Sequence, residues 1–105
     1  PLEPAYCERE TCLSPVMAVR YDLPIVVVIM SNHKLAMIRE EQREANYPPY
    51  GIDLTNPDFA AYAESCGGAG IRVARPQDLA DAVLRAVRMN KPVVIDIETD
   101  PKRFE

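Results

Sequence analysis

The feature that most constrains this chain is a six-residue apolar run at residues 25–30, IVVVIM, in which β-branched residues predominate. It follows Pro24 and ends abruptly at four polar residues, SNHK, at positions 31–34. An apolar run without polar alternation is typical of a strand that is covered on both faces, as in a parallel sheet. Residues 35–46 are rich in strong helix formers. The sequence therefore predicts a strand, a tight polar turn and a helix.

The turn after such a strand is the usual ligand site of an open α/β sheet. The helix behind it directs unpaired N–H groups and the positive end of its dipole at the turn, which suits a phosphate. Asn32 adds a neutral oxygen beside the turn. Such an oxygen suits Mg²⁺, a hard cation that usually also takes oxygens from the phosphates of its substrate. Many turns of this kind bind no ligand, so these residues alone indicate a phosphate and magnesium site with modest specificity.

The rest of the chain alternates helices with short strands. Residues 47–55 are predicted to form a loop, because two prolines and a glycine interrupt them. A helix is expected to start with Asn56 as its cap and to stop at the glycines of positions 67 and 68. A strand at 70–74, an amphipathic helix at 77–89 and a strand at 93–97 follow. Near the end of the last strand, Asp96 and Glu98 are interpreted as polar strand-end residues rather than as a catalytic pair.

This order of elements predicts the fold class. Short strands that alternate with helices are typical of an α/β layer with parallel pairing and right-handed crossovers. We therefore expect a three-layer α/β fold with a mainly parallel sheet of three strands and helices on both faces.

Composition and charge exclude several classes of protein. The chain has 105 residues and a net charge of −4, with acidic and basic residues interspersed, which argues against a nucleic-acid surface. No apolar run approaches the roughly 20 residues that a membrane span needs, and the first ten residues lack the features of a signal peptide. Three cysteines without a CxxC pattern do not predict a disulfide framework, and they indicate a reducing cytoplasm. Because the chain begins with proline rather than methionine, we expect a fragment or a processed product.

The text VRYDLPIVVVIMSN, which ends at Asn32, resembles a recurrent motif of thiamine-diphosphate-dependent enzymes. Continued through HKLAMIREEQ, it is similar to the pyruvate oxidase and acetolactate synthase family, and the likeness extends over residues 19–104. In that family two asparagines end the strand, and the second supplies an oxygen to Mg²⁺. Here Ser31 stands in place of the first asparagine, and Asn32 keeps the position of the metal ligand.

The resemblance also implies the other contacts of the cofactor. The main-chain carbonyl of Lys34 would be a second metal ligand. The residues expected to bind thiamine diphosphate are Asn32, Lys34, Leu35, Ala36 and Met37.

The same resemblance divides the chain after residue 18. Residues 19–105 correspond to the C-terminal half of a thiamine-diphosphate-binding domain, whereas residues 1–18 are an unmatched N-terminal segment. The family's glycine-aspartate-glycine motif would fall near Ala5, and the sequence there contains no such motif. We therefore expect the chain alone to bind thiamine diphosphate poorly and to be catalytically inactive.

Glu41 separates two branches of this family. It lies one helical turn after Met37, so the two side chains are expected to share a face of the helix. The surrounding charges alone favour an ordinary solvated face. By resemblance, acetolactate synthases usually carry a tryptophan at this point and pyruvate oxidases a glutamate, so the text MIREEQ looks closer to pyruvate oxidase. Glu41 would then be the catalytic residue, transferring a proton at the reactive carbon of the cofactor.

The parent enzyme implied by the resemblance acts on pyruvate or a related 2-oxo acid with thiamine diphosphate and Mg²⁺. It would hold FAD in a middle domain and bind thiamine between the subunits of a homo-oligomer, against a separate pyrimidine-binding domain. Two alternatives stay open: an acetolactate synthase-like parent and a catalytically inert α/β module. A flavodoxin-like phosphate binder is disfavoured, because no glycine-rich loop follows a strand.

Overall fold

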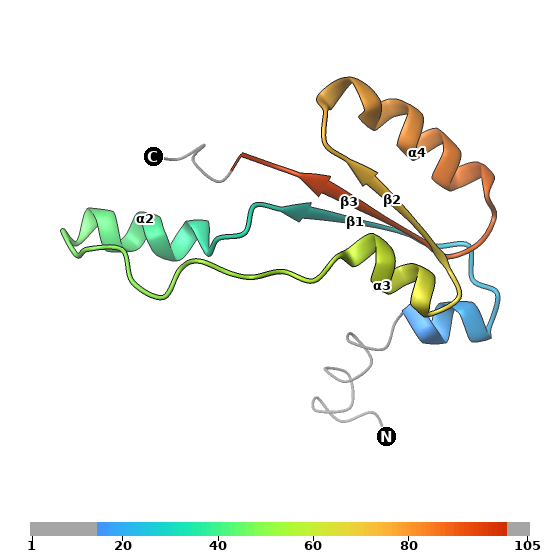
Figure 1. The fold of residues 1–105 in the computed structure, drawn as a ribbon, viewed down its shortest axis with the longest axis horizontal. Coiled ribbons are helices and arrows are strands. Elements are labelled where there is room, and N and C mark those ends of the chain that lie inside the picture. Colours follow the sequence, from blue (N-terminus) through green and yellow to red (C-terminus); the bar gives the residue numbers. More distant parts are fainter. Residues whose placement is uncertain (1–14, 101–105) are drawn as a thin grey trace.

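The computed structural model of the chain describes residues 15–100, and the predictions for residues 1–14 lie outside this range. Three parallel strands form one sheet: β1 (Val26–Ser31), β2 (Ala69–Val73) and β3 (Val93–Glu98). Their order is β1-β3-β2, so the last strand in the sequence lies at the centre (Figure 1). The predicted three-stranded parallel sheet is confirmed.

The register of the sheet brings the carboxyl ends of the strands to one edge. Ser31 at the end of β1 pairs with Glu98 at the end of β3. Val73 at the end of β2 pairs with Ile97. All three strands therefore deliver their following residues to the same side of the molecule, where open α/β sheets bind their ligands.

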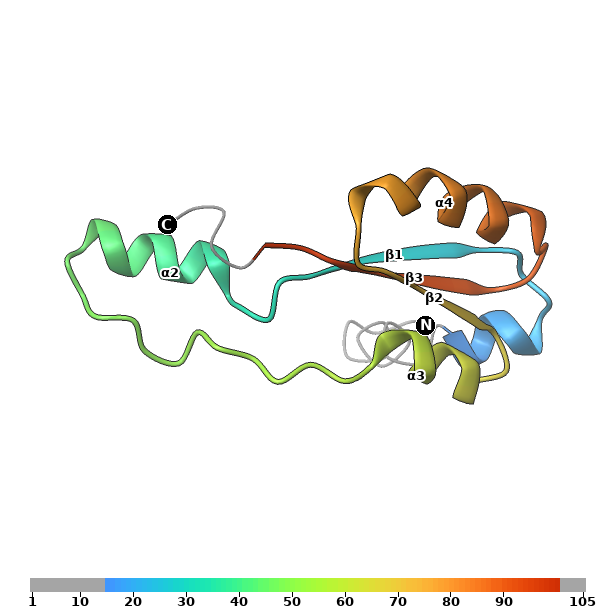
Figure 2. The same cartoon turned by 45° about the horizontal axis from the view of Figure 1, so that its top comes forward.

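Helices cover both faces of the sheet. Helix α3 (Phe59–Ser65) packs on one face of β2 and β3, and α4 (Leu79–Arg88) packs on the other (Figure 2). The core between α4 and the sheet consists of small and β-branched side chains, with Ile95 and Val93 fully buried. Its buried members are Ile71, Val73, Ala82, Ala86, Val93 and Ile95. The expectation of helices on both faces is confirmed.

The start of α3 differs from the prediction. Its cap is Asp58, whose Oδ1 accepts a hydrogen bond from the N–H of Ala61 at 3.0 Å, rather than Asn56. Asn and Asp are equally good caps, so the residue types could not choose between the two positions. The other oxygen of Asp58 pairs with Arg72 of β2 at 3.5 Å, which favours this side chain as the cap.

The start of α4 differs as well. A 3₁₀ turn, η1 (Pro76–Asp78), precedes α4, so the α-helix begins two residues later than predicted. Residues 47–55 form the predicted loop, with a single isolated bridge at Asp53.

Helix α2 (Ala36–Glu44) extends beyond the carboxyl edge of the sheet, and the following loop runs back beside it (Figures 1 and 2). We call residues 33–55 the α2 arm. The side-chain amide of Gln42 bonds both the carbonyl and the N–H of Tyr50, at 2.9 and 3.4 Å, which holds the returning loop against the helix. Ile52 is buried within the arm, whereas α2 itself has no buried residue among those described.

The expectation that the first strand is covered on both faces is wrong for the described residues. β1 is an edge strand, and Val28 and Met30 are 50% and 68% exposed. They lie on the face that carries α4, but α4 packs mainly over β2 and β3. The apolar run therefore predicted the strand correctly, while the described part of the chain covers only one of its faces.

Candidate functional site

The predicted tight turn follows β1 directly. The side-chain Oδ1 of Asn32 accepts a hydrogen bond from the main-chain N–H of Lys34 at 3.1 Å. His33, between them, has a φ of 58°, a left-handed conformation that Asn, Asp and His adopt more readily than most residues. The turn is thus stabilised by its own sequence, and it fixes the side chain of Asn32 relative to the main chain of Lys34.

The bridge between Lys34 and Asp53 orients the main chain of Lys34. It consists of two bonds from flanking residues: Leu35 N–H to Ile52 carbonyl and Leu54 N–H to His33 carbonyl, both 2.8 Å. In an antiparallel pair of this type, the N–H and the carbonyl of the central residue point away from the partner strand. The carbonyl of Lys34 therefore points to the same side as its N–H, which is the side of the Asn32 oxygen.

Helix α2 starts immediately after this turn. Its first residue is Ala36, and within residues 15–100 no side chain caps its N-terminus. Because the N–H of Leu35 already donates to Ile52, the first N–H groups available at this end are those of Ala36 and Met37. The structure thus places Asn32, Lys34 and the start of α2 next to one another.

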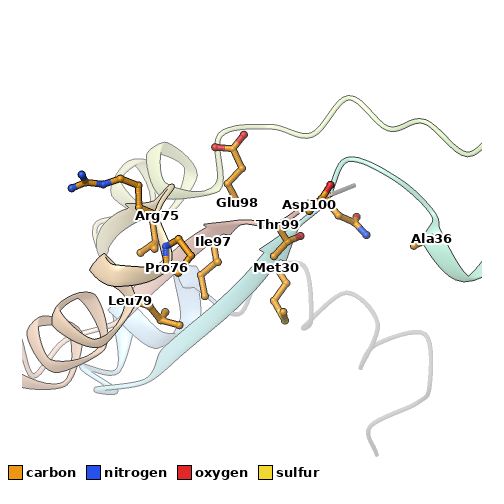
Figure 3. A pocket seen from close by; sticks show the side chains of 11 residues that line it. Met30, Ala36, Arg75, Pro76, Leu79, Ile97, Glu98, Thr99 and Asp100 are labelled. Carbon is orange, nitrogen blue, oxygen red and sulfur yellow. The ribbon is translucent and has the colours of Figure 1, made fainter. Parts of the chain in front are cut away.

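A cavity of about 660 Å³ lies at the carboxyl ends of the strands, within the range of small-molecule sites (Figure 3). Asn32 and Ala36 are part of its wall. Figure 3 shows Met30, Leu79 and Ile97 extending to one side of the sheet, while Arg75 and Glu98 extend to the other. The lining is Met30, Asn32, Ala36, Val73, Arg75, Pro76, Leu79, Ile97, Glu98, Thr99 and Asp100.

A buried pair of polar side chains lies at the same carboxyl edge of the sheet, on the face opposite to Met30 and Ile97. The hydroxyl of Ser31 donates to Oδ1 of Asp96 at 2.6 Å, and each residue is only 6% exposed. A smaller cavity of about 160 Å³ adjoins this pair, and His33 and Arg72 are among its lining residues. The sequence alone indicates no role for Asp96 other than that of a polar residue at the end of the strand. The signal that could have found the pair is a single carboxylate in the otherwise apolar text VVIDI.

The structure places Glu41 and Met37 along α2, away from both cavities. Both side chains are exposed, with Met37 at 75%. The catalytic role of Glu41 stays a prediction, because Glu41 lines neither of these two cavities.

The donor set of the turn limits the metals it could hold. Among residues 15–100 there is no group of three or more His, Cys, Asp or Glu side chains that could bind a metal ion. Asn32 and the Lys34 carbonyl are neutral oxygens, which suit Mg²⁺ when a bound phosphate supplies the remaining charge. The residues present therefore fit part of a magnesium–diphosphate site.

The described part of the chain also contains no helix long and apolar enough to cross a membrane.

Several curated proteins are similar to this chain. The chain is 46% identical over 80 residues to YdaP of Bacillus subtilis, a thiamine pyrophosphate-containing protein whose own assignment is provisional. It is 34% identical to an acetolactate synthase of the same organism over 83 residues, and 28% identical to the pyruvate oxidase of Lactiplantibacillus plantarum over 81 residues. These matches cover 76%, 79% and 74% of this chain, but only 14%, 15% and 13% of the relatives.

A solved structure and a family comparison agree with these sequence similarities. The fold matches a thiamine diphosphate-dependent 4-hydroxybenzoylformate decarboxylase of Rhodococcus jostii RHA1, with a TM-score of 0.76 and 27% identity, over 83% of this chain and 17% of that one. Residues 15–97 match the family described as thiamine pyrophosphate enzyme, C-terminal TPP binding domain. From the parallel sheet, the turn at Asn32 and these matches together, we conclude that the chain belongs to the thiamine pyrophosphate enzymes, as part of their C-terminal TPP-binding domain.

Proposed function

We propose that the chain forms part of the magnesium–diphosphate site of an enzyme that decarboxylates pyruvate or a related 2-oxo acid. The observation that carries this proposal is the turn after β1, where the Asn32 oxygen and the Lys34 carbonyl face the same side. The uncapped N-terminus of α2 follows directly and offers N–H groups with a positive dipole. Oxygen ligands beside free N–H groups suit a cation and a diphosphate bound together.

Each residue of this corner has a role in the proposal. Asn32 and Lys34 hold Mg²⁺, and the N–H groups of Ala36 and Met37 hold the diphosphate. The N–H of Leu35 is already bonded to Ile52, so Leu35 would contact the cofactor through its side chain. When bound, thiamine diphosphate supplies stabilisation of a carbanion formed at the substrate carbon. The chain's own contribution is to bind and orient the cofactor, and Glu41 gives or takes a proton at the reactive carbon.

The branch of the family rests on two observations that point in different directions. Glu41 and the text MIREEQ favour a pyruvate oxidase, which would also hold FAD. Sequence identity favours an acetolactate synthase as the second candidate, because two such enzymes are 34% and 35% identical to the chain and the pyruvate oxidase is 28% identical. We keep pyruvate oxidase as the proposal, because residue 41 would lie beside the reacting atoms. Overall sequence identity, in contrast, averages over the whole domain.

The proposal includes partners for the α2 arm. The chain spans 14% and 15% of the length of its relatives, so a complete enzyme of this family contains much more chain. In the described residues, α2 has no buried residue, and its Met37 and Ile38 are exposed. We propose that the pyrimidine-binding and middle domains of the parent cover this arm, and that the site is completed between subunits of a cytoplasmic homo-oligomer.

The first prediction is that this chain alone binds thiamine diphosphate only at millimolar concentration, if at all. The remaining contacts are a few hydrogen bonds and one metal corner, each worth about 1–3 kcal/mol before the entropy of association is subtracted. Isothermal titration calorimetry with Mg²⁺ present measures this directly. A micromolar dissociation constant would contradict the view that the binding site is shared with other parts of the enzyme.

The second prediction tests the metal corner in the complete enzyme. Asn32→Ala removes an oxygen ligand and should weaken cofactor retention with little change in folding, because Asn32 lies in a turn and not in the core. Asn32→Asp should be milder, because it keeps an oxygen and adds negative charge facing the cation. The measurement is the Mg²⁺ and thiamine diphosphate concentration that restores half of the activity. Equal requirements for wild type and Asn32→Ala would disprove the assignment.

A further inference from the structure

The buried pair of Ser31 and Asp96 joins two strands at the point where the turn begins. The donor and acceptor oxygens are 2.6 Å apart, which is the length of a hydroxyl bond to a charged carboxylate. The two residues are 65 positions apart in the sequence and each is 6% exposed. Hydrogen bonds to a charged group are about twice as strong as neutral ones, so this pair holds the end of β1 firmly against β3.

A main-chain bond reinforces the same point. The N–H of Thr99, just past the end of β3, donates to the carbonyl of Ser31 at 2.9 Å. Ser31 is thus held through its side chain and through its main chain by the central strand. The next residue, Asn32, lies between this fixed residue and the tight turn at His33. Its main chain therefore has little freedom. The position of Ser31 therefore determines where the Asn32 side chain lies.

In the described part of the chain, Oδ1 of Asp96 accepts the hydrogen bond of the Ser31 hydroxyl. Arg72 lies opposite Asp96 in the register of β2 and β3, but its guanidinium pairs with Asp58 at 3.5 Å. Glu98, two residues after Asp96, lines the same small cavity. Loss of the Ser31 hydroxyl would leave the buried Oδ1 without this donor, so the end of β1 and the carboxylate would have to rearrange.

We propose that Ser31 and Asp96 are positioning residues for the metal corner: their bond sets the end of β1 so that the Asn32 oxygen and the Lys34 carbonyl meet the same cation. This inference rests on the proposed function, because it assumes that Asn32 binds the metal. It assigns a use to the serine that replaces an asparagine in this family, and to a buried carboxylate that touches no ligand itself. Groups that orient metal ligands affect affinity without contacting the metal.

The experiment uses Mn²⁺ with thiamine diphosphate as the probe, because Mn²⁺ takes the same oxygen ligands as Mg²⁺ and broadens nearby NMR signals. The readout is the probe concentration that halves the side-chain amide signal of Asn32, relative to the amides of α4. The measurement is made on the complete enzyme, in which the cofactor site is whole, and it does not depend on turnover. Ser31→Ala should raise this concentration about tenfold. Ser31→Thr keeps a hydroxyl and should restore the wild-type value.

Ser65→Ala is the matched control. It removes a serine hydroxyl that also makes a short bond, to the carbonyl of Tyr62 at 2.7 Å, but on α3. It should leave the broadening of Asn32 unchanged. A wild-type broadening profile in folded Ser31→Ala would overturn the inference and reduce the pair to a purely structural role.

Three further outcomes are possible. If Ser31→Ala does not fold, Asp96→Asn replaces it: the neutral acceptor weakens the bond, so the required probe concentration should again rise, and an unchanged value overturns the inference. If the complete wild-type enzyme shows no broadening at Asn32, the metal corner of the proposed function fails, and this inference fails with it. Broadening in wild type with equal broadening in Ser31→Ala, or in Asp96→Asn where it replaces Ser31→Ala, rejects the positioning role alone.

Discussion

Replacing Glu41 by glutamine in the complete enzyme is expected to lower turnover of pyruvate by about 10²- to 10⁴-fold at saturating cofactor. The substitution keeps the shape of the side chain and removes its ability to give or take a proton. If Glu41 moves a proton at the reactive carbon, its loss affects the chemical step, so kcat should fall while cofactor binding is maintained. The measurement is steady-state decarboxylation of pyruvate by the purified variant, with thiamine diphosphate and Mg²⁺ in excess.

Glu40→Gln is the matched control for this experiment. It makes the same chemical change one residue earlier on α2, at a side chain that pairs with Arg43 at 3.4 Å on the helix surface. Such a surface pair contributes little, at most about 1 kcal/mol of stability, so the rate should stay at the wild-type level. Wild-type turnover in Glu41→Gln would instead assign Glu41 to the solvated face of the helix and remove the argument for an oxidase.

Gly70→Ala is expected to destabilise the fold by about 3 kcal/mol or more, because it overfills a contact between main-chain atoms. A Cβ at position 70 would lie 2.1 Å from the carbonyl oxygen of Ala60 and 2.5 Å from its carbonyl carbon. These are backbone atoms of α3, so the clash is relieved only if α3 moves off β2. Domains of this size are stable by only about 5–15 kcal/mol, so a loss of this size removes much of the stability. Urea denaturation followed by circular dichroism measures the change.

Gly51→Ala separates this clash from the general cost of replacing glycine. Nothing lies within 4 Å of a Cβ at position 51, although its φ of +66° is left-handed. The expected cost is therefore about 1–2 kcal/mol from backbone conformation alone. If both alanine substitutions lowered the free energy of unfolding equally, the close approach of Ala60 to Gly70 would not explain the effect of Gly70→Ala.

The sequence predicted the elements well because each has a local residue pattern of its own. The run before Ser31 and the text after Pro92 lack polar alternation, and the amphipathic stripe of α4 has the period of a helix. The order of elements then determined the parallel sheet. The cap of α3 was assigned wrongly because Asn56 and Asp58 are equivalent by type, and the choice depends on Arg72 of another strand.

The site was predictable where it is local. The turn from Asn32 to Lys34 is stabilised by its own residues, so its composition was sufficient to locate it. The pair of Ser31 and Asp96 is not local, because it depends on which strands become neighbours across 65 positions. The exposure of Met30 could not be predicted either, since it depends on which surfaces α4 reaches rather than on the strand itself.

The central place of β3 has a consequence for how the chain is made. β1 and β2 each pair with β3, and β3 separates them in the sheet. During synthesis from the N-terminus, neither strand can join this sheet until Val93–Glu98 has emerged. The 67 residues from Ser31 to Glu98 (98 − 31) take about 3–13 s at roughly 5–20 residues per second. For those seconds the apolar run of β1 has no partner strand in this sheet, and only afterwards can it become part of the sheet.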